Sequence, residues 1–219
     1  MKKNNIVLPK VDENGEMYIS YSQVTLWKRS KREYIRRYFF GEDDTNEMLQ
    51  VYGDFGSKVG EALEKGDYSE FESVGVKLLK GVPRLDLFEK EVRFEFDGFY
   101  VKGFIDSCSK DFTHIIDYKT GDIDKKAADY ASDDYIQVAL YAAAIKQMHN
   151  VTPTTGQVVL IGRDGNAFKG EELTLSGEVK NIDLDVSEMR LAEVAQEVLA
   201  ITKEISDYYK AYLKLNELI

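Results

Sequence analysis

The chain has 219 residues, of which 43% are hydrophobic and 12% aromatic. These proportions are typical of a globular domain with a substantial core and exclude a disordered protein. The single cysteine, Cys108, excludes an internal disulfide and any multi-cysteine zinc or iron–sulfur site. No run is long and apolar enough to span a membrane, and the polar start MKKNN lacks the apolar stretch of a signal peptide, so we expect a cytoplasmic protein without membrane contact.

The net charge is −10, from 29 basic and 39 acidic residues. A nucleic-acid partner would therefore need a local positive cluster, because phosphate contact depends on local rather than total charge. The densest cluster lies in residues 20–40, which predict one helix capped near Ser20 or Ser22. Trp27 lies beside the basic face, which consists of Lys28, Arg29, Arg32 and Arg36. Either a solvated helix face or a phosphate-binding surface explains this cluster.

Two further helices are expected at residues 54–65 and 68–80. In the first of them Gly56 and Gly60 are four residues apart and share one face. A glycine inside a helix costs about 1 kcal/mol relative to alanine.

A β-rich region follows from Glu89, with Asp97-Gly98 as a two-residue hairpin turn. Strands are expected at 89–96, 99–106, 112–120 and 156–162, with one or two more in 170–185. A loop at 122–133 and a helix at 134–148 separate the third and fourth strands, and a long helix starts at Asp185 or Ser187. This order predicts an α/β fold with a mixed central β-sheet flanked by helices. We expect one domain over 1–219, with an N-terminal helical part at about 18–82, a core at about 83–185 and a C-terminal helix at about 187–216.

Residues 103–121 bring two carboxylates and a lysine into one strand–turn–strand unit. Asp106 and Asp117 follow apolar residues of adjacent strands and could share a divalent cation. Strand alternation puts Asp117 and Lys119 on one side of the sheet and Tyr118 on the other. An ammonium beside a metal-bound water is what phosphodiester hydrolysis needs. A hairpin with solvated charges would explain the same residues.

The helix at 134–148 supplies Gln137 and Tyr141, which lie four residues apart on one face, about 6 Å from each other. Gln137 could bind a catalytic water, a phosphate or the lysine, and Tyr141 could donate to a phosphate. Taken in isolation, the pair is better explained by a partly buried polar group and a core aromatic.

Together these segments resemble the RecB-type branch of the PD-(D/E)XK nuclease superfamily, which includes CRISPR-adaptation and phage exonucleases. GFID, ending at Asp106, resembles the second motif of the family, and IIDYKTG, with Asp117 and Lys119, resembles the third. QVALY, with Gln137 and Tyr141, matches its Q-x-x-x-Y motif. The segment SYSQVTLWKRSKREYIRRY resembles the N-terminal motif, so the resemblance covers roughly residues 20–165.

The resemblance implies a restriction-endonuclease-like core and a Mg²⁺ or Mn²⁺ ion held by Asp106, Asp117 and the backbone carbonyl of Tyr118. Lys119 would orient the attacking water and stabilise developing charge.

Gln137 and Tyr141 would position water and phosphate, and Thr120 would contact DNA. Trp27 or Tyr34 would offer a stacking surface if exposed. The DNA backbone would be held by Lys28, Arg29, Arg32 and Arg36.

The sequence departs from the family at two points. The metal-ligand histidine of the family falls at Gly60, so Glu64 or Glu61 could supply a carboxylate, water could fill the space, or activity could be lost. Ser30 and Lys31 replace a Cys-Pro pair, so the iron–sulfur cluster of some relatives is not expected.

We therefore expect a metal-dependent DNA exonuclease in a bacterial or phage-infected cell. It would hydrolyse single-stranded DNA or duplex ends in recombination, repair or replication, and a recombination or replication protein could be its partner. The main alternative is a catalytically attenuated module that binds DNA or protein. A restriction-type endonuclease is a third hypothesis, but the chain has no obvious separate recognition domain.

Overall fold

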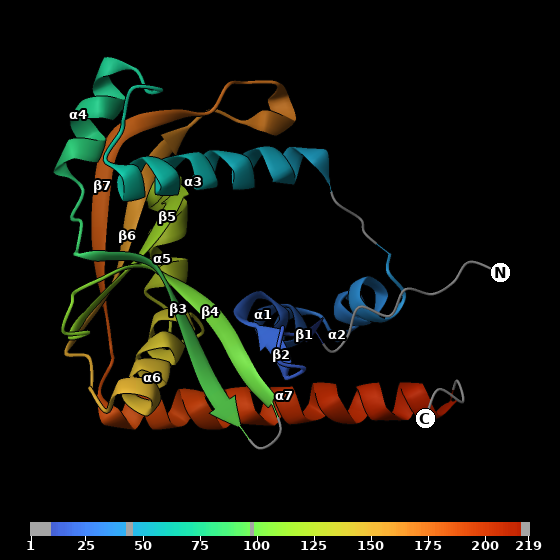
Figure 1. The fold of residues 1–219 in the computed structure, drawn as a ribbon. Coiled ribbons are helices and arrows are strands. Elements are labelled where there is room, and N and C mark those ends of the chain that lie inside the picture. The colour runs from blue at the N-terminus through green and yellow to red at the C-terminus, as the bar shows by residue number, and fades with distance from the viewer. Residues whose placement is uncertain (1–9, 43–45, 97–98, 216–219) are drawn as a thin grey trace.

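The structure is a computed structural model that describes residues 10–42, 46–96 and 99–215. In this part of the chain seven strands form one mixed sheet, in which β3 pairs with β4 and the other strands follow the order β1-β2-β4-β5-β6-β7 (Figure 1). This confirms the expected α/β fold with a mixed central sheet. The strands are β1 Lys10–Val11, β2 Met17–Ser20, β3 Leu87–Phe96, β4 Phe99–Cys108, β5 His114–Gly121, β6 Thr155–Asp164 and β7 Thr174–Leu184.

Long antiparallel pairings lie at the two sides of the sheet, and a parallel pairing lies between them. β3 and β4 form the expected hairpin up to the pair Phe96↔Phe99, while the turn residues 97–98 lie outside the described residues. β5 and β6 are parallel, which requires the intervening chain to cross over the sheet. β6 and β7 are antiparallel, and the expected strand in 170–185 is the single strand β7.

Helices cover both faces of the sheet, with α3 and α4 at the top of Figure 1 and α6 and α7 at the bottom. Side-chain alternation in β5 separates the two faces. Ile115 packs in the core cluster that contains α6 and α7, whereas Ile116 packs in the cluster that contains α3 and α4. The helices are α1 Tyr21–Arg29, α2 Lys31–Tyr34, α3 Glu47–Lys65, α4 Ser73–Gly81, α5 Ile123–Tyr130, α6 Gln137–His149 and α7 Glu188–Leu215.

The expectation of one helix over 20–40 is wrong. The chain breaks at Ser30, which has extended backbone and whose Oγ accepts a hydrogen bond from the Glu33 amide. Serine favours such a cap because its hydroxyl competes with helical backbone hydrogen bonds. After α2, residues Ile35–Phe39 form a π-helical turn. The part at 18–82 is also not purely helical, because β2 pairs in parallel with β4.

Three other element predictions need correction. The segment 122–133 is not simply a loop, because Asp122 caps the short helix α5. α3 begins at Glu47 rather than at residue 54, after the cap Asn46. α4 begins at Ser73, so residues 68–72 are not part of it.

No helix in the described ranges is long and apolar enough to cross a membrane. The longest, α7, presents its buried residues to the core along one face, including Leu191, Val194 and Val198.

Candidate active site

β4 and β5 separate at the place where the predicted site residues lie. Only two residue pairs join these strands, Ser107↔Ile116 and Cys108↔Ile115. Past them, the Asp106 Oδ2 atom accepts a hydrogen bond of 2.7 Å from the Tyr118 backbone N–H. The carboxylate thus satisfies an amide that a regular antiparallel partner would otherwise pair. The gap between the strands makes room for a site.

Asp117 and Lys119 lie on the same side of β5, as strand alternation predicts. The Lys119 Nζ atom is 2.8 Å from Asp117 Oδ1 and 2.7 Å from Oδ2. Tyr118 points to the other face, where its hydroxyl donates to the Pro83 carbonyl. Asp117 is only 2% exposed, so its charge is neutralised by the ion pair with Lys119 rather than by water.

The two carboxylates carry more negative charge than the lysine offsets. Burial, and then the charge of Asp117, raise the pKa of Asp106 to about 7. Burial lowers the pKa of Lys119, but the charges of Asp117 and Asp106 outweigh burial and raise it above its ordinary value. The site therefore consists of an ammonium and two closely spaced carboxyl groups, an arrangement that a divalent cation would neutralise.

Tyr135 is a site residue that the sequence did not reveal. Its hydroxyl donates a 2.7 Å hydrogen bond to Asp117 Oδ2 and lies 3.0 Å from Gln137 Oε1. Burial, and then Asp117, raise the pKa of Tyr135 far above its ordinary value, so the hydroxyl keeps its proton. Tyr135 precedes α6, outside the i, i+4 pattern that singled out Gln137 and Tyr141, and therefore carried no periodic signal.

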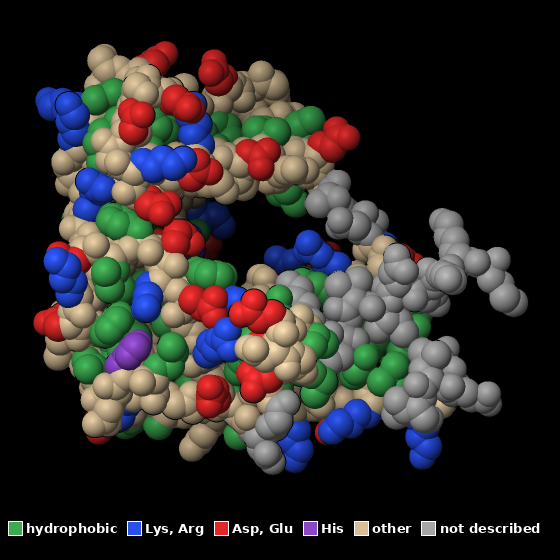
Figure 2. All heavy atoms as spheres, in the orientation of Figure 1, with side chains coloured by type: hydrophobic (Ala, Val, Ile, Leu, Met, Phe, Trp, Pro, Cys, Tyr) green, Lys and Arg blue, Asp and Glu red, His purple; other side chains and the backbone are tan. Residues whose placement is uncertain are grey.

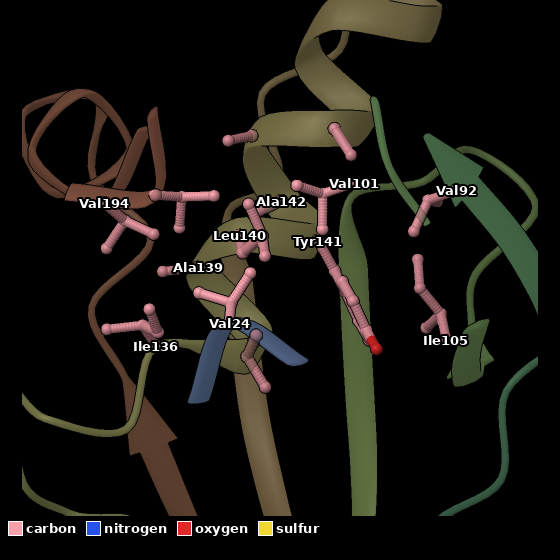
Figure 3. Packing of buried hydrophobic residues seen from close by; sticks show 14 of the residues in the cluster. Val24, Val92, Val101, Ile105, Ile136, Ala139, Leu140, Tyr141, Ala142 and Val194 are labelled. Carbon is pink, nitrogen blue, oxygen red and sulfur yellow. The ribbon is translucent and has the colours of Figure 1, made fainter. Parts of the chain in front are cut away.

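Gln137 and Tyr141 interact as predicted, with Gln137 Nε2 3.2 Å from the Tyr141 hydroxyl oxygen. Figure 3 shows the Tyr141 side chain reaching from α6 between Val101 and Ile105 of β4. Gly103 lies between these two residues on β4, and a Cβ atom there would come within 2.3 Å of the Tyr141 ring. The missing side chain of Gly103 is thus what lets Tyr141 lie against the strand.

A cavity of about 430 Å³ opens between α3 and strands β3 to β5, and both Asp106 and Lys119 line it. The molecule is hollowed between α3 and the part that contains α1 and α7 (Figure 2). Thr120 also lines the cavity and faces Gly56 of α3. Its predicted role in DNA contact stays a prediction. Gly60 lines the same cavity, and a Cβ atom there would meet no other heavy atom within 4 Å.

The sequence profile of the PD-(D/E)XK nuclease superfamily matches residues 71–212, a range that contains all the site residues described above except those of α3. The chain belongs to the PD-(D/E)XK nuclease superfamily. The superfamily prediction is confirmed, whereas the RecB-type branch stays a prediction. Among curated proteins none matches the chain.

One solved structure similar to this superfamily member is that of a "putative exonuclease" from Eubacterium rectale. The two chains are 16% identical, with a TM-score of 0.52, and the match covers 89% of this chain and 82% of the other. At this identity the likeness shows a shared fold.

The residues of this superfamily site that could hold a metal are Asp106 and Asp117. Carboxylate oxygens are the ligands that Mg²⁺ and Mn²⁺ prefer, and water completes their coordination. Among the described residues, no three His, Cys, Asp or Glu side chains are close enough to hold an ion by themselves. Glu64 lines the cavity together with Glu89, and its role as a ligand stays a prediction, as does that of the Tyr118 carbonyl.

The predicted basic surface on α1 and α2 is largely neutralised by acidic partners. Lys28 lies 2.7 Å from Glu197 of α7 and 3.1 Å from Asp134. Arg29 pairs with Glu33 at 3.3 Å. These contacts leave less positive charge for phosphate than the sequence suggested.

Arg36 likewise pairs with Glu42 at 2.7 Å, whereas Arg32 is exposed and has no ion pair among the described residues. The DNA-binding role of the basic side chains stays a prediction.

The stacking surface expected at Trp27 or Tyr34 is not available. Trp27 is 1% exposed, donates from Nε1 to Glu204 and packs edge-on against Tyr208 of α7. Tyr34 is also fully buried. Packing of α7 over α1 buries the aromatic face that a helix taken alone would expose.

Proposed function

We propose that this member of the superfamily is a Mg²⁺- or Mn²⁺-dependent deoxyribonuclease, acting as an exonuclease on single-stranded DNA or duplex ends. The observation that carries the proposal is the meeting of Asp106, Asp117 and Lys119 where β4 and β5 separate, with Asp106 and Lys119 lining a cavity. Two carboxylates and an ammonium around one point are the groups that metal-assisted phosphodiester hydrolysis requires.

Asp106 and Asp117 would hold the cation, which polarises the scissile phosphate and lowers the pKa of an attacking water. In the structure, Lys119 neutralises Asp117. A bound cation would take over that role, and the Lys119 ammonium could then donate to the attacking water and to the negative charge that develops on the phosphate.

The exonuclease assignment is supported by the likeness in fold to the "putative exonuclease" from Eubacterium rectale. A cavity beside an open hollow suits a single strand or a strand end (Figure 2). Recombination, repair or replication as the setting, a protein partner from those processes and a single domain over 1–219 remain predictions.

The test uses end-labelled single-stranded and duplex DNA, with Mg²⁺, Mn²⁺ or a chelator. Asp117→Ala and Lys119→Ala should each abolish metal-dependent cleavage. Lys146→Ala is the matched control, because Lys146 pairs with Glu188 at the similar distance of 2.7 Å on the exposed side of α6. Undiminished cleavage by either site variant would overturn the mechanism, and a ladder of internal cuts from circular DNA would replace the exonuclease by an endonuclease.

The glycine at position 60, where the family has a metal-ligand histidine, favours one alternative, a catalytically attenuated module that binds DNA or protein. The structure leaves Asp106 and Asp117 without a third protein side chain as a ligand among the described residues. Such a module would bind DNA with and without metal, and any cleavage in its preparations would persist in Asp117→Ala.

A further inference from the structure

We propose that Tyr135 is a positioning residue for Asp117, and that Gln137 and Tyr141 act through Tyr135 rather than by touching the substrate. The inference rests on the proposed function in one respect, since it takes Asp117 to be a metal ligand. It assigns the Gln137–Tyr141 pair to the support of a carboxylate instead of to water or phosphate.

The four side chains form one continuous chain of polar contacts. The Tyr141 hydroxyl oxygen is 3.2 Å from the Gln137 amide, which is 3.0 Å from the Tyr135 hydroxyl oxygen. That hydroxyl in turn is 2.7 Å from Asp117 Oδ2. The chain thus leads from the middle of α6 to the carboxylate on β5.

The number of available protons decides which groups donate and which accept along this series of hydrogen bonds. As oriented, the Gln137 amide presents its oxygen to Tyr135, so the single Tyr135 proton would face two acceptors, Gln137 Oε1 and Asp117 Oδ2. Reversing the amide exchanges its oxygen and nitrogen, which are alike in size, and leaves every contact in place. Gln137 then donates to the Tyr135 oxygen, accepts from the Tyr141 hydroxyl, and leaves the Tyr135 proton for Asp117.

In this arrangement every donor points toward Asp117, so each hydrogen bond strengthens the next. The Tyr141 proton is committed to Gln137 and is not free for a phosphate. Gly103 supports the same assignment, because the absence of its side chain allows the Tyr141 ring, which is 5% exposed, to pack against β4. A buried, fixed tyrosine suits a supporting role better than contact with a mobile substrate.

The consequence for Asp117 is a fixed orientation. The carboxylate is 2% exposed, so water cannot readily replace the donor on Oδ2. Tyr135 donates to Oδ2, whereas Lys119 contacts both oxygens, Oδ2 at 2.7 Å and Oδ1 at 2.8 Å. A cation that displaces Lys119 would therefore find Oδ1 without the tyrosine donor and available as a ligand. Groups that orient a ligand in this way typically change metal affinity by about 10–100-fold when they are removed.

The test measures Mn²⁺ affinity of the full chain by calorimetry or electron paramagnetic resonance, and compares cleavage at limiting and saturating Mn²⁺. Tyr135→Phe removes one oxygen and should weaken Mn²⁺ binding about 10-fold or more. Its cleavage rate should recover to within a few-fold of wild type at saturating Mn²⁺. A loss confined to the rate at saturation would instead make Tyr135 a substrate contact.

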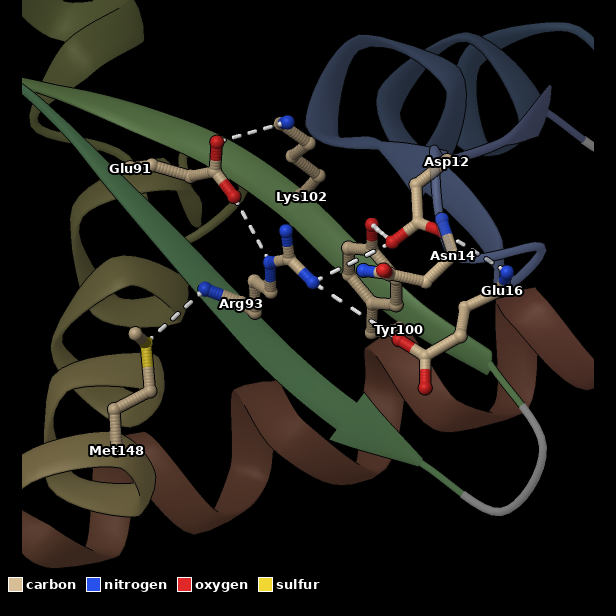
Figure 4. A network of polar contacts seen from close by, with 8 residues as sticks. All are labelled: Asp12, Asn14, Glu16, Glu91, Arg93, Tyr100, Lys102 and Met148. Carbon is tan, nitrogen blue, oxygen red and sulfur yellow. Dashed lines mark hydrogen bonds and ion pairs between the residues drawn. The ribbon is translucent and has the colours of Figure 1, made fainter.

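The matched control is Tyr100→Phe. Tyr100 is also buried and also donates to an aspartate, with its hydroxyl 2.9 Å from Asp12 Oδ2. This hydrogen bond belongs to a separate polar network that includes Arg93 (Figure 4). This variant loses a similar hydrogen bond and should bind Mn²⁺ with wild-type affinity. An equal loss of affinity in both variants would show a general effect of removing a buried hydroxyl and overturn the proposal.

Gln137→Leu gives a second, independent readout. It removes the donor to Tyr135 but leaves Tyr135 on Asp117, so Mn²⁺ affinity should fall less than in Tyr135→Phe. Unchanged Mn²⁺ affinity in both site variants, with wild type binding the ion, would overturn this inference alone. Failure of wild type itself to bind Mn²⁺ would overturn the metal-dependent function and the inference with it.

Discussion

On the α6 side of the candidate site the side chains leave no room, whereas the α3 side faces open space. A single added carbon at Gly103 would collide with Tyr141. The same carbon at Gly60, on the opposite wall, would meet nothing within 4 Å. Gly103 makes room for the Tyr141 ring, whereas Gly60 borders the open cavity.

The difference separates the part of the site that fixes geometry from the part that admits ligands. On the α6 side, Tyr135 binds Asp117 and is linked to Tyr141 through Gln137. On the α3 side, Glu64 and Gly60 line the cavity. Groups that must be held within a fraction of an ångström are packed, and the space for metal and substrate is left open.

The largest expected effect comes from Lys119→Ala, which removes the positive charge that pairs with Asp117. Asp117 would be left buried without its ion-pair partner, so we expect a loss of about 3 kcal/mol in unfolding free energy in the presence of chelator. Mn²⁺ should restore more stability to this variant than to wild type, because the ion replaces the missing charge. Chemical denaturation with and without Mn²⁺ measures both effects.

Lys146→Ala again provides the control, since its pair with Glu188 is exposed and should be worth less than about 1 kcal/mol. Equal Mn²⁺ stabilisation of wild type and Lys119→Ala would contradict the idea that lysine and cation neutralise the same carboxylate.

Gly103→Ala should have the next largest effect. The added carbon would lie 2.3 Å from the Tyr141 ring, and overpacking of this kind costs about 2 kcal/mol. The ring must move, so activity should fall as well. Urea denaturation measures the loss.

A double variant tests the cause. Tyr141→Leu in the background of Gly103→Ala should recover part of the stability, because the two changes act on one contact. Strict additivity of the two single effects would mean that Gly103 and Tyr141 do not compete for this space.

Gly60→His tests the open side with a much larger side chain. Because no atom obstructs its Cβ, the variant should fold, and its imidazole should tighten Mn²⁺ binding about tenfold, or about 1.4 kcal/mol, if it reaches the ion. Gly53→His is the comparison variant, since Gly53 also lines the cavity and has equally open space about two helical turns away. Equal affinity gains in both would indicate non-specific binding by an added histidine.

The smallest effect is expected from Gly60→Ala, and its sign is opposite to that of Gly103→Ala. Alanine relieves the cost of an interior helical glycine without a clash, so unfolding free energy should rise by about 0.5–1 kcal/mol. Thermal denaturation with matched samples measures it. A destabilised Gly60→Ala would show that the α3 wall is packed after all.

Much of the site could be predicted because it depends on local geometry. Strand alternation placed Asp117 and Lys119 together, and helical spacing placed Gln137 beside Tyr141. These contacts join residues two or four positions apart, and their secondary structure alone brings them together.

Other features depended on packing between distant segments and could not be predicted. The Tyr135–Asp117 contact depends on how the chain enters α6, and the burial of Trp27 depends on α7, which lies at the other end of the sequence. Lys28 was expected on a free basic surface, but Glu197 of α7 neutralises it. A helix read by itself shows which face is basic and aromatic, but not what covers that face.

The sequence by itself determined the α/β class and the strand pair that carries the two carboxylates and the lysine, because hydrophobic period is a local property of the chain. The short motifs in these segments carried the resemblance to the nuclease superfamily. Only the tertiary structure decided that β4 and β5 separate at Asp106 and that Tyr135 binds Asp117. It also decided that Gly103 is tightly packed against Tyr141 while Gly60 borders open space. These features arise where segments far apart in the chain compete for the same space, and that competition is settled by packing rather than by any one segment.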